Sequence, residues 1–200
     1  MNQPLEIKPD LDYLVKTHET LYAEHRPRLE ESLKRCTEAL HLTPPDRIPV
    51  WQVSQTSLFP RHELFYDPEK NLMAALSKNI MSMQAGSDFV PFLDPFEGVT
   101  IIAEAFGCKT HVQHNGDPVV SDPIIKKAED VYSLKKPDLD HPVFQRIFKT
   151  QKVWGEATGW QVPIGTTDPQ SPLDVVSIMW ETENFYMSLY DNPKEMHYIL

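Results

Sequence analysis

Three short polar segments of this chain carry side chains that could orient a substrate or move a proton. Each segment lies in or directly after an apolar stretch with the composition of a buried strand. Carboxylates can act as general acids or bases, and amides can hold a substrate through directed hydrogen bonds. The candidate catalytic residues are Asp94 and Asp168, and the candidate substrate-binding residues are Trp51, Gln52, Gln55 and Gln170.

Each candidate also has an ordinary structural explanation. Asp94 and Asp168 both precede a proline and could simply initiate turns. Gln52 could be a satisfied amide in the core, and Trp51 could be a packing residue. The functional interpretation depends on three polar segments meeting at one edge of a sheet, where parallel α/β folds collect their chemistry.

The order of predicted elements favours such a sheet. Apolar stretches predict strands at 48–53, 88–93, 109–113, 119–121 and 160–165. Helical spacing predicts two helices on either side of Pro27, then helices over 67–84, 99–106 and 141–158. Further helices are expected from Ser171 and from about Glu183 or Asn192, where a capping residue precedes a proline or an acid. This alternation predicts an α/β fold with a parallel sheet covered by helices, although a two-layer α/β sheet of another type stays open.

Composition excludes several classes of partner. The net charge is -10, and Lys and Arg are scattered, so that a nucleic acid is disfavoured. No apolar stretch approaches the roughly 20 residues of a membrane-spanning helix, and the N-terminus does not resemble a secretory signal. The chain has only two cysteines, which favours reduced thiols in a cytoplasmic protein. They form no CxxC pair, which argues against a metal site built from this segment.

Several segments occur in the order typical of one family. A strand with the sequence Ile48-Pro49-Val50-Trp51 is followed by a strand ending at Asp94 and by the turn Glu104-Ala105-Phe106-Gly107. A Pro-Val-Val segment at 118–120 and the helix with Asp191, Pro193 and His197 come later. In this order the segments resemble the N-terminal portion of the uroporphyrinogen decarboxylase superfamily, which includes corrinoid-linked methyltransferases. The resemblance implies a (β/α)8 TIM-type barrel, present only as its incomplete N-terminal part over residues 46–200, after a helical extension over residues 1–45.

One departure from the family pattern bears on the reaction. Decarboxylases of this family carry two arginines, which contact substrate carboxylates, in the loop after the first strand. Here that loop reads Ser54-Gln55-Thr56-Ser57-Leu58-Phe59, which keeps a glutamine and lacks both arginines. Arginine is the residue best suited to bind carboxylates, so a substrate with many carboxylates fits this chain poorly.

The resemblance therefore implies corrinoid- or thiol-linked methyl transfer, or related chemistry on a small substrate. Decarboxylation of uroporphyrinogen in porphyrin biosynthesis is one alternative, and a non-catalytic fragment or partner-dependent half-barrel is another. In the methyltransferase branch a His and two Cys hold a zinc ion, but these ligands belong to the later half of the family fold. Zinc and a corrinoid are thus expected only for the complete enzyme. The expected macromolecular partners are a corrinoid protein and either a partner chain or the missing C-terminal half.

Overall fold

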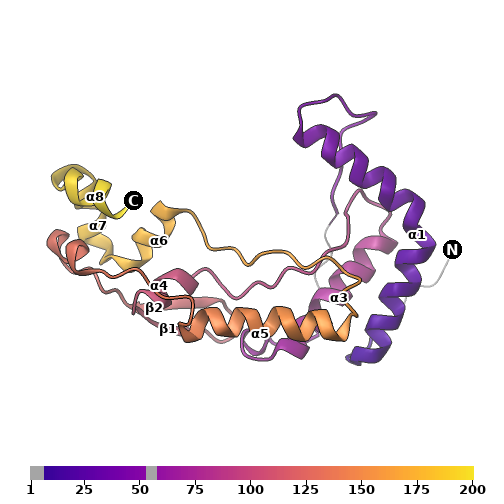
Figure 1. The fold of residues 1–200 in the computed structure, drawn as a ribbon, viewed down its shortest axis with the longest axis horizontal. Coiled ribbons are helices and arrows are strands. Elements are labelled where there is room, and N and C mark those ends of the chain that lie inside the picture. The colour runs from indigo at the N-terminus through magenta and orange to yellow at the C-terminus, as the bar shows by residue number, and fades with distance from the viewer. Residues whose placement is uncertain (1–6, 53–57) are drawn as a thin grey trace. The chain divides into compact units, whose positions relative to one another are not determined.

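The structure is a computed structural model that describes residues 7–52 and 58–200, and it divides into two compact units (Figure 1). The first unit comprises Met1–Pro95 and Gln151–Gly165, and the second comprises Phe96–Thr150 and Thr166–Leu200. Each unit is described by itself below. The domain boundary predicted at residue 45 stays a prediction.

Two helices dominate the first unit. The helix α1 (Leu11–Leu40) begins where the Asp10 side chain accepts the Tyr13 N–H at 2.9 Å. The helix α3 (Pro68–Gln84) begins as predicted, with the Asp67 carboxylate accepting two backbone N–H groups and a proline in the first turn. The two helices pack together, and a one-turn helix, α2 (Arg61–Leu64), lies beside α3. Their shared core contains Leu14, Leu21, Leu29, Leu72, Leu76, Ile80 and Trp154.

The prediction of two helices separated at Pro27 was wrong. The chain forms one helix of 30 residues with Pro27 inside it. A proline in a helix interior removes one backbone hydrogen bond and costs about 3 kcal/mol. Leu21 and Leu29, on either side of the proline, are both buried in the core shared with α3. We attribute the continuity of the helix to this packing, which outweighs the local cost.

The predicted strands at 88–93 and 160–165 are parallel neighbours but pair only at one bridge. The Leu93 N–H donates to the Pro163 carbonyl, and the Gly165 N–H donates to the Leu93 carbonyl, each at 2.8 Å. Pro91 and Pro163 have no N–H to extend the ladder, which explains its shortness. Residues 48–52 form no strand, so that part of the prediction was wrong, and residue 53 lies outside the described residues.

The second unit contains a hairpin and short helices. The helix α4 (Ile101–Ala105) ends before Gly107, which has a φ of +105°. The strands β1 (Lys109–Val112) and β2 (Pro118–Asp122) follow, and then the 3-10 helix η1 (Ala128–Ser133). The helix α5 (Pro142–Ala157) is shared with the first unit. The last elements are α6 (Pro172–Met179), α7 (Thr182–Asp191) and α8 (Pro193–Ile199).

Both strands of the hairpin were predicted, but their pairing was not. Among the described residues, β1 and β2 form a two-stranded antiparallel sheet rather than part of a parallel one. The connection of five residues is long enough for a hairpin but too short for the helical crossover that parallel strands need. A parallel bridge does occur between Ile125 and Trp180, beside a core that includes Val131, Val176 and Met179. None of the described helices combines the length and apolar character required to cross a membrane.

Candidate functional site

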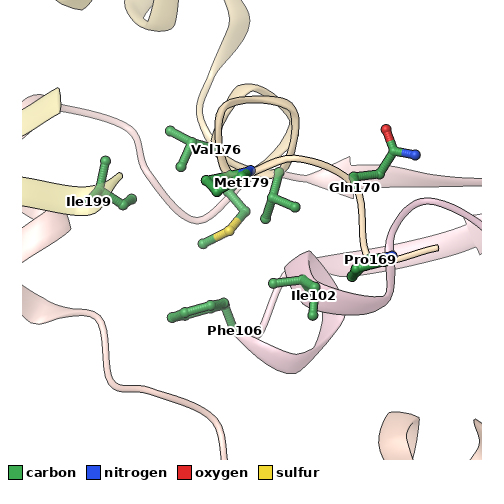
Figure 2. A pocket seen from close by; sticks show the side chains of 9 residues that line it. Ile102, Phe106, Pro169, Gln170, Val176, Met179 and Ile199 are labelled. Atoms are coloured by element: carbon green, nitrogen blue, oxygen red, sulfur yellow. The ribbon is translucent and has the colours of Figure 1, made fainter. Parts of the chain in front are cut away.

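An apolar pocket of about 260 Å³ lies in the second unit. Figure 2 shows Val176 and Met179 of α6 on one side and Ile102 of α4 and Phe106, which directly follows α4, on the other. Gln170 lies at the margin, with its amide turned away from Met179 and Phe106. Gln170 carries the polar side-chain group among the lining residues, and the described lining includes no charged side chain. The remaining residues of the lining are Pro169, Pro172, Val175 and Ile199.

The loop before α6 brings Asp168 and Gln170 together. The Asp168 carboxylate accepts the Gln170 backbone N–H at 2.9 Å and its side-chain amide N–H at 3.0 Å. Gln170 has a φ of +62°, a conformation that non-glycine residues rarely adopt. The two hydrogen bonds offset the cost of this conformation and hold the amide beside the exposed carboxylate. The proximity expected from the sequence is therefore present, while the catalytic and binding roles stay predictions.

The start of α6 sets the position of the pocket wall. The Ser171 hydroxyl donates to the Asp174 carboxylate at 2.7 Å and accepts the Asp174 N–H at 3.4 Å. Pro172 occupies the first turn, where its missing N–H is harmless. Val175, Val176 and Met179 follow at helical spacing and turn their side chains to the core and the pocket.

Trp51, Gln52 and Asp94 belong to the first unit. The Trp51 indole N–H donates to the Cys36 sulfur at 3.2 Å, and its ring packs edge-on against Phe89 at a centroid distance of 5.7 Å. Gln52 is exposed, and Asp94, directly after the bridge at Leu93, is half-buried. Gln55 lies outside the described residues. The common mouth predicted for candidates from both units stays a prediction.

The sequence analysis missed Asp88, which anchors the segment before Gln52. Its buried carboxylate accepts from Arg47 at 2.5 and 2.8 Å, from Arg35 at 2.5 Å and from the Val50 N–H at 2.9 Å. Burial opposes ionisation, but the hydrogen bonds from Arg47 and the Val50 N–H and the two arginine charges hold the pKa of Asp88 below its usual value. Asp88 therefore fixes the chain two residues ahead of Gln52.

Glu97 is a second buried acid, in the second unit. Its side chain is 2% exposed, accepts the Thr150 hydroxyl at 2.8 Å and pairs with Arg146 at 3.3 Å. Arg146 also contacts Glu104 at 3.4 Å. Burial raises the pKa of Glu97, and the bonds from Thr150 and Arg146 only partly oppose this. A buried acid of this kind suits proton transfer, but buried ion-pair networks show the same shift, so we assign Glu97 no catalytic role.

The described residues do not supply a zinc site. In residues 7–52 and 58–200 no three His, Cys, Asp or Glu side chains gather closely enough to hold a metal ion. Cys36 is half-buried in the first unit, and Cys108 is buried in the core of the second. Burial raises the pKa of the Cys108 thiol, which disfavours the thiolate that zinc requires. The described part of the chain thus does not form the donor set of one His and two Cys implied for the methyltransferase branch.

Comparison with known proteins identifies the family. The family model of uroporphyrinogen decarboxylase (URO-D) matches residues 31–200. The chain belongs to the uroporphyrinogen decarboxylase family. The resemblance inferred from the sequence is therefore confirmed, and it extends over part of α1 as well as the segments that first indicated it.

A solved structure adds support for the fold. A methyltransferase from Methanosarcina mazei matches with a TM-score of 0.63 and 22% identity over 82% of this chain. The match covers 50% of the methyltransferase chain, so this chain spans half the length of that relative. Searching the curated proteins returned no match. At this identity the likeness shows a shared fold.

Proposed function

We propose that this chain forms the N-terminal part of a (β/α)8-barrel enzyme that carries out corrinoid- or thiol-linked methyl transfer. The observation that carries the proposal is the uncharged lining of the pocket beside Asp168 and Gln170. A methyl group or small aliphatic group loses little on entering such a pocket and gains from leaving water. The similarity of fold to a methyltransferase supports the same choice.

Decarboxylation of uroporphyrinogen fits these residues less well. Its substrate carries many carboxylates, which need paired cations when they leave water. The described pocket lining offers none, and the sequence Ser54 to Phe59 contains no arginine. The chain as a whole carries a net charge of -10, which repels a polyanion.

In the proposed reaction the residues of this chain bind the substrate, orient it and transfer a proton. Asp168 would hold the Gln170 amide at the pocket margin, where the amide can accept or donate one hydrogen bond to the substrate. Asp94 would accept or release a proton, and Trp51, Gln52 and Gln55 would contact the substrate. Zinc, when bound in this branch, activates a thiol, and its ligands would come from outside the described residues. A corrinoid protein would be the methyl donor or acceptor.

The test compares two reactions on the longest natural form of the protein. One sample receives methylcobalamin with a panel of small thiols, and loss of the methyl group is followed by the corrinoid absorbance. A second sample receives uroporphyrinogen, and released CO2 is measured. We expect demethylation that depends on the thiol and no CO2. Rapid CO2 release without demethylation would refute the proposal in favour of decarboxylation.

A partner-dependent half-barrel is the second candidate. It is favoured by the extent of the structural match, since the chain covers only 50% of the methyltransferase. On this hypothesis the 200 residues alone would lack activity in both assays, and activity would return when the complementary half is added.

A further inference from the structure

The helix α7 is apolar on its exposed side as well as on its buried side. Phe185 is buried against Trp180, at a ring-centroid distance of 6.3 Å, and Ser188 one turn later is also buried. On the other side Tyr186, Met187 and Tyr190 are 66%, 61% and 89% exposed. Large apolar side chains that lie exposed together on a surface mark sites of interaction.

The exposed residues share one helix face. Tyr186, Met187 and Tyr190 follow Glu183 at spacings of three, four and seven residues, which places all four on one stripe of α7. We call these four residues the α7 face. Tyrosine and methionine are enriched in protein interfaces because they offer a large contact area. The composition of the stripe is thus that of a recognition surface.

A second pair of exposed aromatic rings belongs to the same unit. Tyr198 of α8 and Tyr132 of η1 pack at a centroid distance of 4.8 Å, and they are 61% and 52% exposed. The Tyr132 hydroxyl donates to Glu195 at 3.0 Å, which fixes this pair. Since α8 and η1 are in contact and α8 contacts α7, the apolar surface of the unit extends beyond α7 itself.

The charges around the α7 face indicate which sign of charge a partner would carry. Glu183 and Asp191 are exposed near the two ends of α7, and α7 contains no basic residue. Lys194 belongs to α8, and Lys126, whose backbone carbonyl accepts from the Asn184 amide of α7, is paired with Asp122 at 3.2 Å. A partner that brings Lys or Arg beside its apolar stripe would meet complementary charge. A second copy of this chain would instead place the same acids opposite one another, so self-pairing through this face is disfavoured.

We propose that the α7 face binds a helix with an apolar stripe bordered by Lys or Arg, contributed by the half of the fold that this chain does not span. The observation that points to such a half is the structural match, which covers only 50% of the methyltransferase chain. The inference concerns assembly and does not depend on which reaction the enzyme performs. Failure of the assays above would therefore leave it intact.

The test uses two synthetic helical peptides of about 18 residues with the same leucine stripe, one bordered by lysine and one by glutamate. Each labelled peptide is titrated with the 200-residue chain at low salt, and binding is read from fluorescence anisotropy. We expect the lysine peptide to bind about tenfold or more tightly than the glutamate peptide. Added salt should reduce this preference, because it screens the rim charges.

Variants locate the binding surface. The triple variant Tyr186→Ser, Met187→Ser, Tyr190→Ser should lose about tenfold or more in affinity for the lysine peptide. Leu40→Ser is the matched control, since Leu40 is an exposed apolar residue of the first unit. Circular dichroism checks whether both variants remain folded.

Four outcomes would overturn the inference. They are failure of the lysine peptide to bind, equal binding of both peptides, unchanged binding by the folded triple variant, and a dimer of the chain in sedimentation that the triple variant abolishes. If the triple variant does not fold, the double variant Tyr186→Ser, Tyr190→Ser replaces it with the same expectation.

Discussion

The Asp88 carboxylate lies between the guanidinium groups of Arg35 and Arg47, which approach it from positions 53 and 41 residues away in the sequence. The Asp88 and Arg35 side chains are 3% and 9% exposed, whereas Arg47 is half-exposed. This contact ties α1 and the segment 46–50 to the start of the bridge-forming stretch. It therefore holds the first unit together at the point where the candidate residues Trp51 and Gln52 follow.

We predict that Asp88→Asn destabilises the protein by about 3 kcal/mol, because it removes the buried charge with which both Arg35 and Arg47 pair. Urea unfolding followed by circular dichroism measures the change. Asp46→Asn is the control, because Asp46 also binds Arg35 but its side chain is 67% exposed. A loss of stability in the control as large as that in Asp88→Asn would contradict the assigned role.

Protonation of the buried His18 ring should destabilise the protein in acid. The ring is 2% exposed, and burial lowers the pKa of His18 from 6.5 to about 4. In the folded protein the ring resists protonation. The contribution of His18 to stability is therefore complete above pH 6.5 and is lost as the pH falls toward 4. The loss amounts to about 3 kcal/mol, at 1.36 kcal/mol per pKa unit.

The variant His18→Gln should flatten this part of the pH dependence in urea unfolding measured between pH 4 and 7.5. His41→Gln changes an exposed histidine just after α1 and should leave the dependence unchanged. An unchanged slope in His18→Gln would show that another group is responsible.

Ionisation of Glu97 should make the stability of the protein fall as the pH rises, opposite to the effect of His18. Because burial raises its pKa above the ordinary 4.5, the folded protein favours the protonated acid. Stability from this group is therefore complete below pH 4.5 and declines as the pH rises through its raised pKa. Glu97→Gln keeps an oxygen to accept the Thr150 hydroxyl and removes the charge, so it should remove the decline.

Thermal unfolding of the wild type, Glu97→Gln and the exposed control Glu129→Gln across pH 4 to 7.5 tests this expectation. A midpoint difference between the wild type and Glu97→Gln that does not vary with pH would contradict it.

Replacing Asp168 should lower the catalytic efficiency of the proposed reaction. Asp168→Asn keeps one oxygen for the Gln170 backbone N–H but cannot pair both oxygens with the backbone and the amide of Gln170. Loss of this hydrogen bond, worth about 1.4 kcal/mol, should lower kcat/KM for the proposed methyl transfer about tenfold. Thr166→Ala, an exposed change in the same loop, should not. Equal activity of wild type and Asp168→Asn would remove Asp168 from the site.

Sequence patterns predicted the features that depend on contacts between residues close together in the sequence. The starts of α3 and α6 follow from Asp67 and Ser171, whose side chains bind backbone N–H groups two or three residues ahead. The proximity of Asp168 and Gln170 has the same local origin. These features require no knowledge of the rest of the fold.

Long-range contacts could not be predicted in the same way. The continuity of α1 through Pro27 accompanies packing against α3, and the clamp at Asp88 joins residues far apart in the chain. Neither leaves a periodic signal. The antiparallel pairing of β1 and β2 was missed because the strand pattern alone does not indicate direction.

The central claim is tested most directly by carbon NMR of one sample. The longest natural form of the protein is mixed with ¹³C-methyl cobalamin, a small thiol and uroporphyrinogen labelled with ¹³C in its carboxyl groups. The account predicts a growing thioether methyl signal and unchanged carboxyl signals. Labelled CO2 or bicarbonate appearing while the methyl signal stays on cobalt would contradict it.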